Sequence, residues 1–168
     1  LRIVKGHGPS DWNAYGISID TRTLRKGDIF FALAGPNYDG HQFINEAIKK
    51  GACVVVSNAP VLNHEKKVIV VNDVVKALIA LGKSSRNRNK GKIIAVTGSS
   101  GKTTVKEMLA LSLSDSGKIH YSQSSYNNKI GVSLSLARMP SDTDFSIFEV
   151  GMNNYGEISY LSKMIKTD

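Results

Sequence analysis

With 168 residues the chain can hold one medium-sized domain or two small ones, and a hydrophobic fraction of 41% is ordinary for a globular protein with a real core. No apolar run approaches the roughly 20 residues of a membrane span, and the N-terminus lacks the pattern of a signal peptide. Cys53 is the only cysteine, so no internal disulfide can form. We therefore expect a cytoplasmic protein without a membrane partner.

The formal net charge of +8 is compatible with nucleic acid, with polyanionic small molecules such as nucleotides, or with solubility alone. The basic residues are spread along the chain apart from one cluster, Lys83 to Lys92. No aromatic residue lies in this cluster to stack on bases. We interpret it as a solvated helix end and linker, and expect no nucleic-acid partner.

The first half of the chain predicts a compact α/β module. Short runs bounded by glycine turns and continuous β-branched runs predict strands at four places: 16–20, 28–33, 52–56 and 68–71. Helical spacing predicts a helix at 43–48, before Gly51, and a second at 74–84, with Asn72-Asp73 as its N-cap.

The polar stretch 84–91 has almost no apolar content and is the best candidate for a domain boundary. Beyond it, strands and helices alternate, which predicts a parallel sheet with right-handed crossovers. The expected strands are 93–96, 119–122 and 145–150, and the expected helices are 103–114, 130–137 and 157–165. We expect four side chains of the first of these helices to lie on its inner side: Val105, Met108, Leu109 and Leu111.

The most informative stretch is 93–104, Ile-Ile-Ala-Val-Thr-Gly-Ser-Ser-Gly-Lys-Thr-Thr, in which a buried strand leads through a turn of small residues into a helix. Gly98 and Gly101 allow positive φ, so that backbone N–H groups can point at an anion, and the helix start adds partial positive charge. Lys102 can reach β- and γ-phosphates, and the hydroxyl of Thr103 can ligate Mg²⁺.

The match to the common phosphate-loop pattern is incomplete, because Val96 stands where that pattern has its first glycine. The alternative is a simple strand-to-helix turn with an exposed lysine, but the strand and helix on either side favour phosphate binding. We therefore predict binding of the ATP phosphates by eight residues: Thr97, Gly98, Ser99, Ser100, Gly101, Lys102, Thr103 and Thr104.

The short form Thr-Gly-x-x-Gly-Lys-Thr resembles the ATP loop of the Mur ligase and folylpolyglutamate synthase superfamily, whose members join a carboxylate to an amine at the expense of ATP. A second segment, 148–153, resembles the family's Glu-x-Gly-x-x segment, which carries a glutamate that helps to bind Mg²⁺. Alone, Glu149 reads as a strand-end surface residue; beside this loop, the metal role is favoured. The resemblance implies Mg²⁺ held by Thr103 and Glu149, with Lys102 and Glu149 as catalytic residues.

Further segments resemble the branch of the family that adds D-alanyl-D-alanine to UDP-MurNAc-tripeptide in peptidoglycan synthesis. In the first half these are the Ser-Ile-Asp-Thr-Arg signature with its following strand, at 18–33, and Gly-x-x-x-Asp-Gly-His-x-Phe at 35–43. In the second half they are Asn-Asn-x-Ile-Gly-Val at 127–132 and Gly-Glu-Ile at 156–158. The last two select this branch over its siblings. Together the segments extend the resemblance over nearly the whole chain.

That resemblance implies an α/β protein in two parts: a small UDP-substrate-binding module at 1–86, a linker at 87–91, and the first part of a P-loop parallel-sheet domain, the Mur ligase central domain, at 92–168. The implied cofactors are ATP and Mg²⁺, the implied partners are UDP-MurNAc-tripeptide and D-alanyl-D-alanine, and a monomer is the default. The implied reaction passes the γ-phosphoryl group of ATP to the tripeptide carboxylate, and the dipeptide amine attacks the acyl phosphate. Substrate contacts are expected from Ser18, Thr21, Arg22, His41, Asn127 and Asn128.

Only about three strands of the second sheet precede Asp168, which is few for an open parallel sheet. We infer a fragment of a longer protein, and expect little or no ligase activity from it alone. The sequence leaves open whether the third residue of the tripeptide is lysine or diaminopimelate.

Several site residues have structural alternatives. Arg22 could form a surface ion pair with Asp20 or Asp28, His41 could belong to a helix cap, and the two asparagines could serve a turn. Alternative functions are a sibling Mur ligase that adds a single amino acid, a non-catalytic nucleotide-binding module, a small kinase or GTPase, and a nucleic-acid-binding domain that uses Arg86, Arg88, Lys90 and Lys92.

Overall fold

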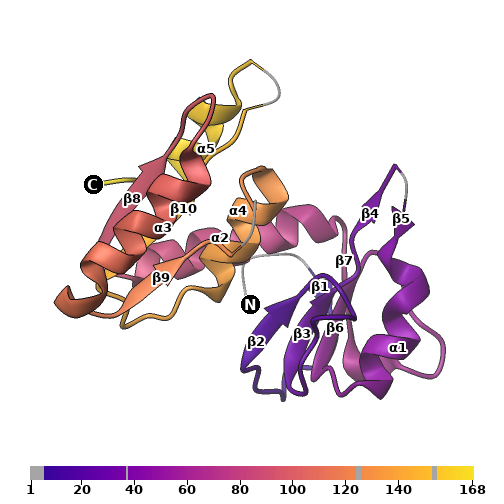
Figure 1. The fold of residues 1–168 in the computed structure, drawn as a ribbon. Coiled ribbons are helices and arrows are strands. Elements are labelled where there is room, and N and C mark those ends of the chain that lie inside the picture. The colour runs from indigo at the N-terminus through magenta and orange to yellow at the C-terminus, as the bar shows by residue number, and fades with distance from the viewer. Residues whose placement is uncertain (1–5, 37, 124–125, 153–154) are drawn as a thin grey trace. The chain divides into compact units, whose positions relative to one another are not determined.

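The computed structural model describes residues 6–36, 38–123, 126–152 and 155–168; Asn37 and Asn153, which belong to the motif segments, lie outside the described residues. The chain divides into two compact units, Leu1–Ala80 and Leu81–Asp168. Each unit contains a sheet with helices (Figure 1), which confirms the predicted α/β class. Among the described residues, no helix has both the length and the apolarity of a membrane span.

A five-stranded sheet of order β1-β7-β6-β3-β2 forms the first unit. Four of its strands run parallel: β2 (Gly16–Ser18), β3 (Asp28–Phe31), β6 (Val54–Ser57) and β7 (Val68–Val71). The 3₁₀ helix η1 (Gly40–Phe43) leads into α1 (Ile44–Lys49), which packs on β6 around a buried cluster that includes Phe30, Ala47 and Val55. The 3₁₀ helix η2 (Glu65–Lys67) precedes β7.

The strands and the helix predicted for this unit are present with shifted ends, but two pairings are additional. β1 (Gly6–His7) pairs antiparallel with β7, and β4 (Ala34–Gly35) forms a small hairpin with β5 (Tyr38–Asp39). Strands of two residues have no measurable hydrophobic period, so the sequence pattern could not reveal them.

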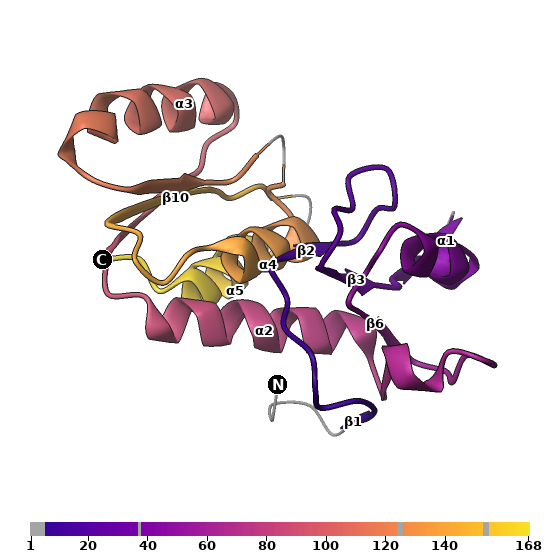
Figure 2. The same cartoon turned by 90° about the horizontal axis from the view of Figure 1, so that it is seen from below.

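The second unit is built on a parallel sheet of order β8-β10-β9. Its elements are β8 (Lys92–Val96), α3 (Lys102–Leu113), η3 (Ser114–Ser116), β9 (Ile119–Tyr121), α4 (Lys129–Arg138), β10 (Phe145–Glu149) and α5 (Glu157–Ile165). Figure 2 shows α3 on one face of this sheet and α4 and α5 on the other. The parallel sheet and the order of its elements agree with the prediction.

The central strand of this sheet determines where a site can form. Glu149, the last residue of β10, is the register partner of Val96, the last residue of β8. The carboxyl ends of parallel strands meet at one edge of a sheet. The turn that follows Val96 therefore begins directly beside Glu149.

The inner face of α3 differs from the prediction. Val105, Met108 and Leu111 are 46%, 64% and 77% exposed, so the expectation that they turn inward is wrong. Leu109 does pack on the buried cluster around Ala110, as expected. The helix has apolar residues on more than one side, and hydrophobicity alone does not say which side meets the sheet.

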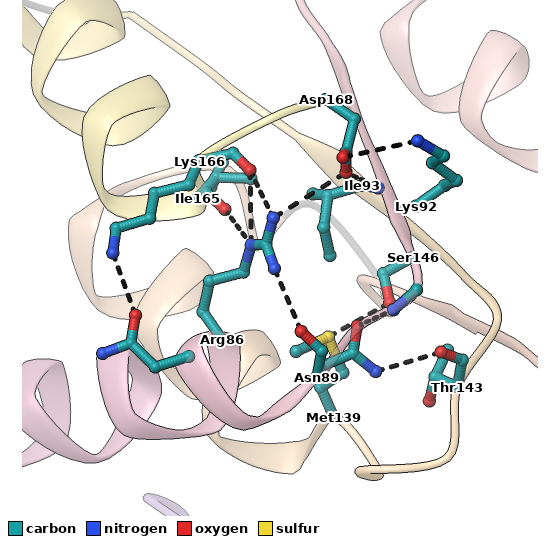
Figure 3. Close-up of polar contacts among 12 residues, drawn as sticks. Arg86, Asn89, Lys92, Ile93, Met139, Thr143, Ser146, Ile165, Lys166 and Asp168 are labelled. Carbon is teal, nitrogen blue, oxygen red and sulfur yellow. Dashed lines mark hydrogen bonds and ion pairs between the residues drawn. The ribbon is translucent and has the colours of Figure 1, made fainter.

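The polar stretch predicted as a boundary is partly helical, because α2 (Val74–Arg88) continues through it. Figure 3 shows the guanidinium of Arg86 among backbone carbonyls at the end of α5. Its Nε donates to the Ile165 carbonyl at 2.7 Å, and its Nη2 donates to the Lys166 carbonyl at 2.6 Å. The Asp168 carboxylate lies 3.7 Å from Nη2 and accepts the Ile93 N–H at 2.9 Å. Arg86 thus joins α2, α5 and β8 within the second unit.

Two more residues of this stretch make structural contacts. Asn89 is buried and its amide donates to the Thr143 carbonyl at 3.0 Å, while Arg88 donates to the Met139 carbonyl at 3.3 Å. The interpretation of this cluster as a solvated helix end and linker is therefore wrong for Arg86 and Asn89, whereas Arg88 is exposed at the end of α2. These contacts also weaken the nucleic-acid alternative, since three of its four basic residues already have partners: Arg86 and Arg88 donate to backbone carbonyls, and Lys92 Nζ lies 3.6 Å from the Asp168 carboxylate.

Arg86→Ala is expected to lower the free energy of unfolding by about 2 kcal/mol, because it removes charged hydrogen bonds from the last carbonyls of α5. Urea unfolding followed by circular dichroism measures this change. Lys83→Ala, at an exposed position of the same helix, is the matched control and should change stability by less than about 0.5 kcal/mol. Equal effects of the two variants would contradict the structural role of Arg86.

Candidate functional site

The turn between β8 and α3 is open to solvent from Thr97 to Gly101. Both of its glycines have positive φ, 155° at Gly98 and 74° at Gly101, as predicted. Gly101 is the N-cap of α3 and has no side chain to satisfy the first N–H groups of the helix, which lack intrahelical acceptors. Open amides at a helix N-terminus favour a bound anion.

The side chain of Lys102 folds back over this turn. Its Nζ donates to the carbonyl of Gly98 at 2.8 Å. The ammonium therefore lies against the loop rather than extending into bulk solvent. This places a positive charge at the segment that is predicted to hold phosphates.

Glu149 is 2% exposed, and each of its carboxylate oxygens accepts a hydrogen bond from a different element. The Thr103 hydroxyl on α3 donates to Oε2 at 2.8 Å, and the Asn127 amide before α4 donates to Oε1 at 2.9 Å. Gly151 allows Asn127 to come this close, because a Cβ there would lie 2.8 Å from Asn127 Cγ. The structure thus brings together a hydroxyl, a carboxylate and an amide beside the open turn.

This group fits a magnesium ion by its chemistry. Mg²⁺ in nucleotide sites is bound through one or two protein oxygens and completes its shell with phosphate oxygens and water. The Thr103 hydroxyl and the Glu149 carboxylate form such a pair of hard oxygen donors. They lie at the first turn of α3, next to the predicted phosphate loop.

The two adjacent asparagines have different roles. Asn128 is the N-cap of α4, and its side-chain oxygen accepts the Gly131 N–H at 2.8 Å. This is the turn chemistry that was the alternative to substrate binding. Asn127 instead contacts Glu149.

In the first unit, the turn around Arg22 is satisfied by its own residues. Ser18 is fully buried, and its hydroxyl donates to the Asp20 carbonyl at 2.8 Å. Thr21 is also buried, with its carbonyl bound by Lys50 Nζ at 2.9 Å. Arg22 is exposed and pairs with Asp20, with Nη2 2.6 Å from Oδ2. The hydrogen bond from Arg22 holds the pKa of Asp20 below its usual value, so the ion-pair alternative describes Arg22 in this structure.

His41 lies at the start of η1, where Asp39 is the N-cap. Asp39 Oδ1 accepts the His41 N–H at 2.9 Å and lies 2.6 Å from His41 Nδ1. The backbone hydrogen bond and then the ring contact hold the pKa of Asp39 below its usual value. The other ring nitrogen, Nε2, is buried and has no hydrogen-bond partner within the described part of the chain.

Sequence reasoning missed one residue close to the group formed by Thr103, Glu149 and Asn127. Lys106 is buried on the face of α3 that carries Thr103, three residues earlier. The i, i+3 spacing to Thr103 is the signal that could have drawn attention to it.

An open strand–turn–helix with a lysine over the turn and a buried carboxylate at the next strand end defines a nucleotide-binding protein of the P-loop class. Family comparison agrees with this class: residues 13–97 match the Mur ligase family, catalytic domain, and residues 96–168 match the Mur ligase middle domain. The chain belongs to the Mur ligase family.

Among curated proteins, the chain is 41% identical over 155 residues to UDP-N-acetylmuramoyl-tripeptide–D-alanyl-D-alanine ligase of Rickettsia prowazekii (strain Madrid E), covering 92% of this chain and 34% of that protein. It is also 41% identical over 152 residues to the ligase of the same name from Synechocystis sp., covering 89% and 34%. The chain thus spans about a third of the length of these relatives.

Two solved structures have the same fold. UDP-N-acetylmuramoylalanyl-D-glutamyl-2,6-diaminopimelate–D-alanyl-D-alanyl ligase from Acinetobacter baumannii aligns with a TM-score of 0.82 and 36% identity, covering 92% of this chain and 34% of that one. MurF ligase from Thermotoga maritima, in complex with ADP, aligns with a TM-score of 0.75 and 28% identity, covering 90% and 35%.

Neighbouring asparagine variants should separate the two roles found here. Asn127→Ala is expected to weaken Mg-ATP binding by about tenfold, because Glu149 loses the donor that orients it. Asn128→Ala should lower the free energy of unfolding by about 1 kcal/mol through loss of the α4 cap, and leave Mg-ATP affinity unchanged. Calorimetric titration and urea unfolding of both variants check this; the reverse pattern would contradict the assignment.

Proposed function

We propose that this chain is part of an ATP-dependent ligase of peptidoglycan precursor synthesis that adds D-alanyl-D-alanine to UDP-MurNAc-tripeptide through an acyl phosphate. The observation that carries the proposal is the contact of Thr103 and Asn127 with Glu149 beside the open turn after β8. The names of the Rickettsia and Synechocystis relatives support the reaction, and the ADP in the Thermotoga structure supports the nucleotide.

In this proposal the second unit binds ATP. The loop amides from Thr97 to Thr104 surround the phosphates, and the Lys102 ammonium stabilises charge on the transferring γ-phosphoryl group. Thr103 and Glu149 hold Mg²⁺, which when bound neutralises phosphate charge. Asn127 keeps the Glu149 carboxylate oriented.

The tripeptide carboxylate attacks the γ-phosphorus of ATP, and ADP leaves. The dipeptide amine then attacks the resulting acyl carbon, and phosphate leaves from a tetrahedral intermediate as the amide forms. The residues named here bind and orient these groups. We place this chemistry in the cytoplasm.

We propose that the first unit, Leu1–Ala80, which holds most of the predicted segment 1–86, binds the UDP end of the substrate, and that the second unit, Leu81–Asp168, belongs to the ATP-binding domain. The predicted linker 87–91 lies inside the second unit, where Asn89 is buried. Arg22 is the exposed cationic group of the first unit's turn, and its fork of donors suits a diphosphate. His41 offers a buried nitrogen that lacks a partner among the described residues. Ser18 and Thr21 support the turn.

Separate calorimetric titrations of Mg-ATP and of UDP-MurNAc-tripeptide test this layout. Lys102→Ala should weaken Mg-ATP binding about ten- to a hundredfold, the loss expected for charged hydrogen bonds, without affecting the UDP substrate. Arg22→Ala should do the converse. Lys163→Ala removes an exposed lysine from α5 and serves as the charge control. Mg-ATP affinity that is indifferent to Lys102→Ala would refute the nucleotide site.

A further inference from the structure

Lys106 lies on α3 with 1% of its surface exposed, and among the described residues it is the only lysine or arginine that is buried. Burying an ammonium group is unfavourable unless its donors are satisfied by well-placed acceptors. A buried lysine at this position therefore calls for a specific partner. None of the roles described so far uses this side chain.

The partner is Ser122, the residue directly after β9. Lys106 Nζ donates to the Ser122 carbonyl at 2.8 Å, inside the unit, and lies 5.9 Å from the centre of the Tyr121 ring. The Glu107 carboxylate lies 4.0 Å from Lys106 Nζ, farther than the Ser122 carbonyl, and is mostly exposed. Lys106 thus attaches α3 to the carboxyl end of β9.

Ser122 in turn is attached to the strand that carries Glu149. Its N–H donates to the Ile147 carbonyl at 3.1 Å, and its hydroxyl accepts the Glu149 N–H at 3.2 Å. Ser122 is fully buried, so these contacts are shielded from water. The backbone of Glu149 is therefore positioned by the same residue that Lys106 holds.

The contacts close into a ring. Glu149 accepts the Thr103 hydroxyl at 2.8 Å, and Thr103 lies three residues before Lys106 on the same face of α3. The ring runs from Lys106 through Ser122 and Glu149 to Thr103, and back along one turn of helix. Both protein oxygens of the magnesium pair belong to it.

We propose that Lys106 is a positioning residue that sets Glu149 against the start of α3 and thereby determines the Mg²⁺ affinity of the nucleotide site. This inference rests on the proposed function of that site. Groups behind metal ligands orient them, and their loss weakens metal binding by about ten- to a hundredfold. If Lys106 served only the fold, its loss would instead lower the affinities for ATP and for Mg²⁺ together.

Lys106→Met keeps the length of the side chain and removes the ammonium. Binding of ATP to the chain is measured by calorimetry over a range of Mg²⁺ concentrations and also with EDTA in place of Mg²⁺. The half-saturating Mg²⁺ concentration should rise about ten- to a hundredfold, while the affinity for ATP without Mg²⁺ stays unchanged. Lys163→Met, at an exposed position on α5, controls for the lost charge and should behave as the wild type.

An unchanged Mg²⁺ requirement in Lys106→Met would overturn the inference, and so would an equal loss of affinity with and without Mg²⁺. If Lys106→Met does not fold, Ser122→Ala decides the matter, because it breaks the ring at the Glu149 N–H and leaves Lys106 in place. A raised Mg²⁺ requirement in Ser122→Ala supports the ring, and a wild-type requirement refutes it.

The wild-type titration separates this inference from the proposed function. If the wild-type chain shows no Mg-ATP binding, the proposed function fails and the inference fails with it. If the wild type binds Mg-ATP and the variants match it, only the role of Lys106 is wrong.

Discussion

A buried carboxylate needs a hydrogen-bond donor for each oxygen, and in the second unit this requirement joins the elements around Glu149. The hydrogen bond from Thr103 joins α3 to Glu149, and the one from Asn127 joins the segment before α4 to it. The register of β10 with β8 places this group at the turn after Val96. The same contacts leave a hydroxyl and a carboxylate side by side, the donor set of a magnesium site. Stability and ligand chemistry therefore depend on one arrangement.

In the first unit, the candidate site is a surface turn rather than a buried carboxylate. The polar groups of its turn form hydrogen bonds with one another, and Arg22 forms an ion pair with Asp20 at the surface, where such a pair contributes at most about 1 kcal/mol to stability. So weak a pairing can be exchanged for a ligand that offers two phosphate groups. The nucleotide loop of the second unit is open in the same sense, since the N-cap glycine leaves the first amides of α3 without a side-chain partner.

Features that are local in sequence could be predicted, and features that depend on packing could not. The strand–turn–helix around Gly98 and Gly101 follows from residue chemistry alone, and the position of Glu149 follows from a strand end and a motif. The inward face of α3 does not, because its apolar residues lie on more than one side of the helix and the acceptor of Lys106 is Ser122, just after β9. Equally, nothing local distinguishes Asn127 from Asn128; only the fold decides which one caps a helix and which one holds Glu149.

The most direct measurement is electron paramagnetic resonance of the chain with ATP and Mn²⁺ in place of Mg²⁺, since Mn²⁺ also prefers oxygen ligands and reports ³¹P nuclei in its coordination shell. The wild type should show protein-bound Mn²⁺ coupled to phosphate phosphorus, and Glu149→Gln should lose that signal while remaining folded. Protein-bound, phosphate-coupled Mn²⁺ of equal intensity in Glu149→Gln would contradict a metal site at this carboxylate.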